Sequence, residues 1–382
     1  MAGLYIHIPF CKSRCIYCGF YSTTRHELRQ RYVDAVCKEM MLKASRSIGH
    51  EVKIETVYLG GGTPSQLSGR QLQQIFACID RAYGMEHVKE VTMECNPDDV
   101  TADFVATLAA LPVNRVSMGV QTFDDQRLRF LHRRHTTAQI SVAVERVRMA
   151  GIGNVSIDLM YGFPNETLAD WHRDIDKALS IGAEHLSAYS LMYEEGTPLY
   201  HLMNNEKSIM NSGKAPRYVP VDEETELQMY NDLTDRLTAA GYEHYEISNF
   251  ARRGFRSRHN SSYWHQVPYI GIGAAAHSYD GESRQWNVDD VKQYIEGIEQ
   301  DKLVCEREML DDDTKYNELI MTSLRCSEGL ELKRLSPNEQ AYCLSQAKRY
   351  LDDGLLVTDS HRLCLTRRGI FVSNMIMSGL MK

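Results

Sequence analysis

The sequence lacks the features that mark several classes of protein. None of its 382 residues fall in a run of about 18 apolar residues, so no transmembrane helix is expected. The first residues, MAGLYIHIPFCKS, have no basic segment followed by a long apolar stretch, so they do not form a secretory signal. Lysine and arginine number 43 against 51 acidic residues, and the net charge of −8 argues against a nucleic-acid partner. A cytoplasmic location is the expectation.

Low-complexity segments are also absent. The chain is 43% hydrophobic and 25% charged, which is typical of a folded globular protein with a sizeable core. At roughly 150 residues per domain, its length predicts two or three domains. We place their boundaries at residues 1–240, 241–310 and 311–382.

Six short β-like segments recur in the first half of the chain, with amphipathic stretches between them. Strands that alternate with helices of this length predict βα units and a parallel sheet. Six such units favour an α/β fold with a partial (β/α)6 barrel over a small doubly wound sheet. The predicted strands are Leu4–Pro9, Thr56–Leu59, Glu90–Met93, Arg115–Val120, Asn154–Leu159 and His185–Leu191. The predicted helices are Arg29–Lys43, Gly69–Ala82, Ala102–Leu111, Ala138–Met149 and Leu168–Ser180.

The second half of the chain does not continue the alternation of predicted strands and helices. Residues 194–221 contain Gly, Pro, Asn and Ser, which predicts a long loop, and a helix is expected over Glu223–Ala240. Residues 311–382 resemble a separate small α+β module. Their end predicts a winged-helix-like order of helix, strand, strand and helix, at Gln340–Asp352, Leu355–Thr358, Arg362–Thr366 and Arg368–Leu380.

Polar residues and glycines gather at the carboxyl ends of the predicted strands. Cys11, Gly60–Gly62, Glu94, Gln121 and Asp158 each lie at or just after such an end. In parallel α/β folds this edge of the sheet is where ligands bind. The sequence therefore predicts a binding site along this rim.

Three of the ten cysteines stand within eight residues, in the pattern Cys11-x-x-x-Cys15-x-x-Cys18. In a protein outside the secretory pathway, clustered cysteines indicate a metal more often than a disulfide. Three thiolates leave one iron of a [4Fe–4S] cubane without a protein ligand, whereas electron-transfer clusters use four cysteines. That open iron can bind the amine and carboxylate of S-adenosylmethionine (SAM) and pass an electron into its sulfonium. The alternative is a structural zinc site, although no second CxxC pair is present.

These motifs together resemble the radical SAM family of coproporphyrinogen dehydrogenase-like proteins, which also contains haem chaperones. The resemblance covers nearly the whole chain. It rests on YIHIPFCKSRCIYCGF (residues 5–20), GGGTPS (60–65), ECNP (94–97), NRVSMGVQTF (114–123), Arg133 and His135, DLMYGFP (158–164), YEISNFA (245–251) and HNSSYW (259–264).

The resemblance implies that the rim binds SAM around a [4Fe–4S] cluster on Cys11, Cys15 and Cys18. A guanidinium suits the SAM carboxylate, and carboxylate or amide groups suit its ribose and amine. Isolated from the other motifs, the glycine run is explained equally well by a tight turn. The family commonly has glycine where this chain has His132. The implied SAM contacts are Tyr5, Tyr17, Gly61, Gly62, Thr63, Glu94, Gln121, Arg133 and Asp158.

Two functions within this family remain open. The dehydrogenases carry a cysteine two residues after the third cluster cysteine, where this chain has Phe20, and so the chain is more similar to the haem chaperones. The resemblance then implies that His259 binds haem iron, with a turn-capping role as the alternative. Haem-accepting proteins, including membrane-bound ones, would be the partners. The second candidate is an oxygen-independent coproporphyrinogen III oxidase, and a third is a radical SAM enzyme for another substrate.

Four arginines precede His259 and offer partners for the carboxylates of haem, the propionates. A solvated basic loop would explain them equally well. They are Arg252, Arg253, Arg256 and Arg258.

Overall fold

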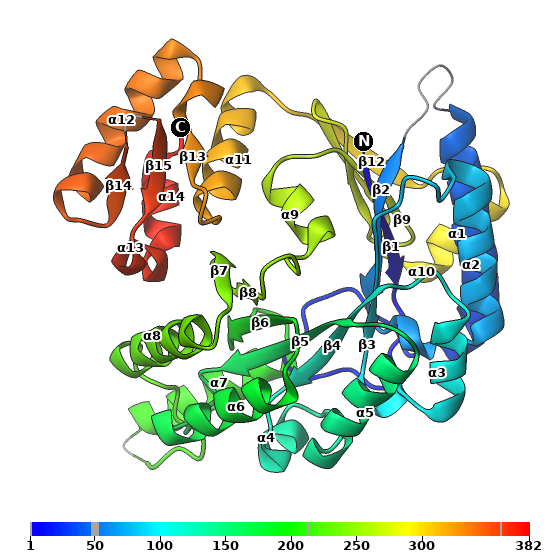
Figure 1. Cartoon of the computed structure of the whole chain (residues 1–382), viewed down its shortest axis with the longest axis horizontal. Helices are drawn as coiled ribbons and strands as arrows, with labels where there is room; N and C mark the ends of the chain where they lie inside the picture. Colours follow the sequence, from blue (N-terminus) through cyan, green and yellow to red (C-terminus); the bar gives the residue numbers. More distant parts are fainter. Residues whose placement is uncertain (1, 47–52, 213, 360) are drawn as a thin grey trace.

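A computed structural model describes residues 2–46, 53–212, 214–359 and 361–382. Its main feature is a curved, mixed sheet with the strand order β12-β11-β10-β9-β1-β2-β3-β4-β5-β6-β8-β7 (Figure 1). The strands of this sheet are β1 (Ala2–Ile8), β2 (Ile54–Gly61), β3 (Glu90–Cys95), β4 (Arg115–Gln121), β5 (Asn154–Tyr161), β6 (His185–Ser190), β7 (Glu243–Glu246), β8 (Asn249–Ala251), β9 (Tyr269–Ile272), β10 (His277–Tyr279), β11 (Ser283–Asn287) and β12 (Cys305–Met309).

Strands β1 to β6 are parallel and follow the order of the chain, which confirms the predicted six-unit α/β barrel core. Helices lie on the outer side of this curved sheet (Figure 1). They are α1 (Arg29–Arg46), α2 (Gly69–Tyr83), α3 (Ala102–Ala109), α4 (Asp125–Phe130), α5 (Thr137–Met149) and α6 (Leu168–Ile181).

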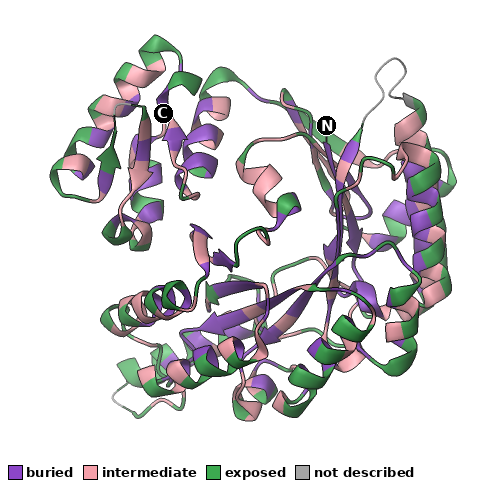
Figure 2. Ribbon diagram, viewed as in Figure 1, coloured by how far each residue is buried: buried purple, intermediate pink, exposed green. Residues whose placement is uncertain are grey.

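Each strand presents two chemically different faces. On β1, Leu4, Ile6 and Ile8 belong to the main hydrophobic core beneath the helices. The alternate residues point to the other face because side chains of a strand alternate. There Tyr5 and His7 are hydrogen bonded to each other. The inner face of the barrel is thus polar, whereas the strands themselves are largely buried (Figure 2).

The segment predicted as a long loop, residues 194–221, instead contains a helix, α7 (Pro198–Asn211). Thr197 caps its first turn by accepting a hydrogen bond from the Tyr200 backbone, and Pro198 suits the first helical position. Leu199 and Met203 are buried in a small hydrophobic cluster that also contains Ile16. The capping threonine and the proline at the start of this helix are visible in the sequence, but the polar residues around them obscured the helical pattern. The helix after it, α8 (Glu223–Ala239), matches its prediction.

Residues 241–310 contribute strands β7 to β12 to the main sheet, which their composition did not predict. They also form α9 (Arg258–Trp264), which lies on the inner side of the sheet, and α10 (Val291–Glu299) (Figure 1). No helix among the described residues is both long and apolar enough to cross a membrane.

The C-terminal module is a small α+β unit with a hydrophobic core of its own. Its antiparallel sheet has the order β13-β15-β14. The predicted last helix is divided in two, because the chain leaves helical geometry at Val372. The elements are α11 (Asp312–Leu324), β13 (Leu330–Glu331), α12 (Pro337–Asp352), β14 (Leu356–Thr358), β15 (Arg362–Leu365), α13 (Arg367–Phe371) and α14 (Ser373–Leu380).

Candidate functional site

The three clustered cysteines lie in a loop that begins where β1 ends. The loop is fixed at its base, since the Cys11 backbone N–H donates to the Thr23 carbonyl at 2.9 Å. All three thiols are free and partly exposed. Burial raises the pKa of Cys11, and it raises that of Cys18 to about 11; the neighbouring thiols add to both shifts. The loop therefore holds three mutually close thiols at the rim.

No three His, Cys, Asp or Glu side chains in the described ranges are arranged to share one metal ion. The thiols of a cubane do not converge on one point, because each binds a different iron. Three thiols in one exposed loop fit this requirement.

A chain of hydrogen bonds connects the Cys11 and Cys15 thiols through the neighbouring strand ends. The Cys11 and Thr63 side chains are 3.5 Å apart. Asn96 Nδ2 donates to Thr63 Oγ1 at 3.3 Å, and Arg133 Nη2 donates to Asn96 Oδ1 at 2.6 Å. Arg133 Nη1 then reaches Cys15 Sγ at 3.6 Å. Asn96 thus has a positioning role that its place in the ECNP motif did not reveal.

The glycine run lets β2 approach the cluster loop closely. A Cβ on Gly62 would lie 2.7 Å from both the Ile8 carbonyl oxygen and the Pro9 carbonyl carbon. Gly61 has φ of +103°, and the His7 ring occupies the space where its Cβ would be. The backbone approach therefore requires glycine at both positions.

We expect Gly62→Ala to destabilise the fold by about 1–3 kcal/mol, because the methyl group would meet rigid backbone atoms. Gly153→Ala is the matched control, since a Cβ there would meet no atom of the described residues within 4 Å. Chemical denaturation of the two cluster-free variants measures the difference. Equal free energies of unfolding would contradict the close-approach explanation.

Glu94 projects from β3 to the same rim. Its carboxylate accepts hydrogen bonds from Tyr58 Oη at 2.7 Å and from the Gly61 backbone N–H at 3.1 Å. Burial raises the pKa of Glu94 to about 7. Burial likewise raises the pKa of Asp158, on β5, to about 6, and Ser117 donates to it at 3.3 Å. Two carboxyl groups with raised pKa values thus line the rim, a property common at functional sites.

Gln121 and Arg133 complete the predicted set at this edge. Gln121 ends β4 at a register shift and has φ of +68°, a conformation that turns the strand end. Arg133 also donates to the Gly119 carbonyl at 2.5 Å, yet its buried Nε has no hydrogen-bond partner among the described residues. His132 has φ of +60°, a left-handed conformation in which glycine would be free of strain.

The two tyrosines predicted to contact SAM lie at different depths in the barrel. Tyr17 lies near the Cys15 and Cys18 thiols and the Arg133 guanidinium, all of which influence its pKa. Tyr5 lies deeper in the barrel, where its hydroxyl and His7 Nδ1 are 3.0 Å apart. The structure therefore brings the cysteines, Tyr17 and the strand-end residues together, with Tyr5 below them.

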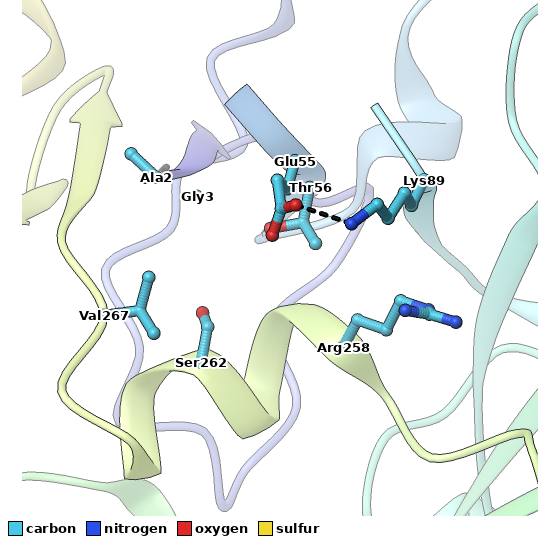
Figure 3. Close-up of a pocket in the computed structure, with 8 residues that line it drawn as sticks. All are labelled: Ala2, Gly3, Glu55, Thr56, Lys89, Arg258, Ser262 and Val267. Carbon is cyan, nitrogen blue, oxygen red and sulfur yellow. Dashed lines mark hydrogen bonds and ion pairs between the residues drawn. The ribbon is translucent and has the colours of Figure 1, made fainter. Parts of the chain in front are cut away.

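His259 lies at the opposite end of the barrel, by the starts of the strands. Its backbone N–H donates to Glu90, the first residue of β3, at 2.9 Å. Beside it, a hollow of about 90 Å³ is bounded by α9 and by the first residues of β1 and β2 (Figure 3). The ion pair between Glu55 and Lys89 stands at its edge, with 2.6 Å between the charged atoms. His259 is nevertheless connected to the rim, because the Tyr58 ring stacks on it with 5.1 Å between centroids and the Tyr58 hydroxyl donates to Glu94.

Both ring nitrogens of His259 are already hydrogen bonded. Nδ1 is 2.8 Å from Thr56 Oγ1, and Nε2 is 2.8 Å from Tyr263 Oη. The side chain is fully buried, and burial lowers its pKa to about 3. In this conformation His259 anchors α9 to the barrel and leaves no nitrogen for iron.

Three of the four arginines before His259 have different surroundings and so do not share one anion site. Arg252 stacks over the Tyr242 ring at 4.6 Å, and Arg256 pairs with Glu243 and Glu328. Arg258 lines the hollow by the strand starts.

Comparison with known proteins places these features in context. Residues 5–178 match the model of the radical SAM superfamily, and residues 310–372 match that of the HemN C-terminal domain. The chain is 34% identical to the haem chaperone HemW of Bacillus subtilis, with 100% of this chain and 99% of that protein covered. It is 33% identical to HemW of Lactococcus lactis, over 97% and 94% of the two chains.

The fold has a solved counterpart. The structure of HemN from Escherichia coli, described as a coproporphyrinogen III oxidase and radical SAM enzyme, superposes with a TM-score of 0.82. It covers 100% of this chain and 90% of that one at 22% identity. This likeness shows the shared architecture of barrel and C-terminal module.

Proposed function

Because the chain belongs to the radical SAM superfamily and, within it, to the family of HemW-like proteins, we propose that it is a haem chaperone. It would bind a [4Fe–4S] cluster, SAM and haem, and deliver haem to acceptor proteins. The observation that carries this proposal is the similarity to HemW along the whole chain, which includes the C-terminal module.

The cluster would be held by Cys11, Cys15 and Cys18. Their loop is partly exposed, its thiols are free, and Arg133 stands beside Cys15 to offset negative charge. When bound, such a cluster supplies an open iron for SAM and an electron that can split its C–S bond.

SAM would lie along the strand ends, between the cluster loop and Gln121. The unpaired Nε of Arg133 offers a donor for the SAM carboxylate. Glu94 would accept from its amine, and Asp158 and Gln121 from its ribose. The glycine run would contribute backbone groups through Gly61, Gly62 and Thr63, with Tyr5 and Tyr17 beside the adenine and cluster.

We expect SAM to bind more tightly as the pH rises through about 7. The pKa of Glu94 in the folded protein is about 7, above its ordinary value of 4.5, so the carboxyl gains a proton as the pH falls below 7. A protonated carboxyl cannot pair with the SAM ammonium. Isothermal titration at several pH values measures this change in SAM affinity.

The raised pKa of Glu94 also affects stability in the absence of SAM. The folded state holds the proton more tightly than the unfolded state, so the free energy of unfolding declines as the pH rises from about 4.5 towards 7.

The second candidate function, porphyrinogen oxidation, is favoured by the HemN-like architecture. Against it stands Phe20, which replaces the extra cysteine of the dehydrogenases and is 71% exposed beside the cluster loop. The acceptors of haem, including membrane-bound ones, and a cytoplasmic location remain expectations from the sequence.

One anaerobic assay separates carrier from catalyst. The cluster-loaded protein is supplied with coproporphyrinogen III, SAM and a reductant, and the formation of protoporphyrinogen is measured. In parallel, the protein is loaded with haem, and the transfer of haem to a haem-free acceptor protein is measured. We expect haem transfer without protoporphyrinogen formation. Product formation at an enzymatic rate would contradict the chaperone assignment.

A further inference from the structure

Two cysteines outside the cluster triplet face each other between helices α1 and α2. These helices lie side by side on the outer side of the barrel (Figure 1). Cys78 Sγ is 3.3 Å from the Cys37 carbonyl oxygen, and Cys37 Sγ is 3.8 Å from the carbonyl oxygen of Gln74, one turn before Cys78. The two thiols are also hydrogen bonded to each other. Each sulfur therefore lies against the backbone of the other helix, and the two sulfurs are neighbours.

Hydrogen bonds between the two helices hold this pair from both sides. One turn nearer the helix starts, Gln74 Nε2 donates to Asp34 Oδ1 at 2.8 Å. One turn nearer the helix ends, the Tyr83 hydroxyl donates to the Met40 carbonyl at 3.5 Å. The helices are thus fixed at the separation at which each sulfur reaches the opposite backbone. A disulfide requires such a close approach, because it joins only residues whose Cβ atoms lie near each other.

The two thiols differ in reactivity. The hydrogen bond from the Cys37 thiol lowers the pKa of Cys78, and the Arg81 guanidinium adds to this effect against the opposing effect of burial. The same hydrogen bond raises the pKa of Cys37, and burial raises it further. Since the thiolate is the reactive form, Cys78 is the better nucleophile. Solvent reaches both residues, because Cys37 is partly exposed and Cys78 keeps 8% of its surface exposed.

We propose that Cys37 and Cys78 are a reversible dithiol–disulfide pair that is oxidised by hydrogen peroxide. The Cys78 thiolate attacks a peroxide oxygen and forms an S–O bond as the O–O bond breaks, and the released hydroxide takes up the proton that Cys78 lost. The Cys37 sulfur then attacks the Cys78 sulfenic acid. An S–S bond forms as the S–O bond breaks, and the proton of Cys37 leaves with that oxygen as water. Two thiols are oxidised while one peroxide is reduced to two waters.

The position of this pair connects it to the rim. Helix α1 follows the cluster loop along the chain, and α2 follows the glycine run at the end of β2. A disulfide between Cys37 and Cys78 would therefore tie together the two helices that continue these two loops. It would also restrict the unfolded chain, so the oxidised protein should resist unfolding better than the reduced protein. This inference does not depend on the binding of haem or SAM.

The test is peptide mapping of the full chain after treatment with hydrogen peroxide, for both cluster-loaded and cluster-free protein. The remaining free thiols are alkylated before digestion to prevent exchange. Trypsin then releases Cys37 and Cys78 in two short peptides, residues 32–38 and 71–81, each of which contains one cysteine. We expect a disulfide to join these two peptides and dithiothreitol to separate them. The oxidised chain should also unfold at a higher denaturant concentration than the reduced chain.

Single variants separate the roles of the two thiols. In Cys37→Ser the sulfenic acid of Cys78 has no thiol to resolve it, so it should persist and be captured by dimedone, which reacts with sulfenic acids. In Cys78→Ser we expect Cys37 to react with peroxide about tenfold more slowly than Cys78 does in Cys37→Ser, because its pKa is raised. Cys364→Ser is the matched control. The Cys364 thiol donates to the Glu328 carbonyl rather than to a thiol, so this variant should form the disulfide as the wild type does.

Two results would overturn the pair. One is a wild-type chain whose two cysteines are oxidised separately, to sulfinic acids, without any linked peptide. The other is a linkage that forms only after the chain has been denatured. Dimedone capture at Cys37 in Cys78→Ser as fast as at Cys78 in Cys37→Ser would overturn the assignment of Cys78 as the nucleophile.

Discussion

Serine in place of Cys18 is expected to abolish the iron–sulfur cluster. After anaerobic reconstitution the variant should retain little iron and lose the visible absorbance of the cluster, because two remaining thiolates cannot hold a cubane that needs three. Cys18 is the most suitable of the three cysteines for this test. Its thiol, unlike that of Cys15, makes no side-chain hydrogen bond to Arg133, so the rim should stay intact.

Cys364→Ser is the control for this experiment. Cys364 is a free, partly buried thiol in the C-terminal module, and its Sγ donates to the Glu328 carbonyl at 3.7 Å. We expect it to retain the full iron content. Equal loss in both variants, or an unchanged cluster in Cys18→Ser, would contradict the assignment of the triplet.

Glu94→Gln is expected to weaken SAM binding at least tenfold, or by about 1.4 kcal/mol. The amide removes the negative charge that would pair with the SAM ammonium. In the wild type, both Tyr58 and the Gly61 backbone donate to the Glu94 carboxylate. The NH₂ group of glutamine would face one of these donors and could not accept its hydrogen bond. Equilibrium binding to the cluster-loaded protein measures the change, and the pH dependence near 7 should disappear with it.

The chain offers a closely matched control for this substitution. Glu166 is also a buried carboxyl whose pKa burial raises to about 7, and it accepts hydrogen bonds from the Gly162 and Phe163 backbone. Glu166→Gln should alter stability but leave SAM affinity within twofold. Similar SAM affinities for the two variants would show that Glu94 has no direct role.

The sequence predicts the rim well because the rule behind it is local. Each of Cys11, Glu94 and Asp158 follows a run of β-forming residues, and parallel strands bring their carboxyl ends to one edge. The structure places Cys11 and Glu94 near this edge as expected, whereas β5 continues to Tyr161, three residues beyond Asp158.

Partners that depend on three-dimensional contacts were not predictable. Asn96 connects Thr63 to Arg133 across three strand ends, and Tyr58 reaches Glu94 from the neighbouring strand. The position of α9 is another example. Nothing local in HNSSYW indicates that His259 would be enclosed near the strand starts.

Paramagnetic resonance of the reduced, cluster-loaded protein, recorded with and without SAM, tests the central claim most directly. We expect the signal of a reduced cubane whose spectrum changes when SAM is added, since SAM would bind the iron that lacks a cysteine. A protein that yields no such signal, a signal indifferent to SAM, or a lone zinc ion at the triplet would contradict it.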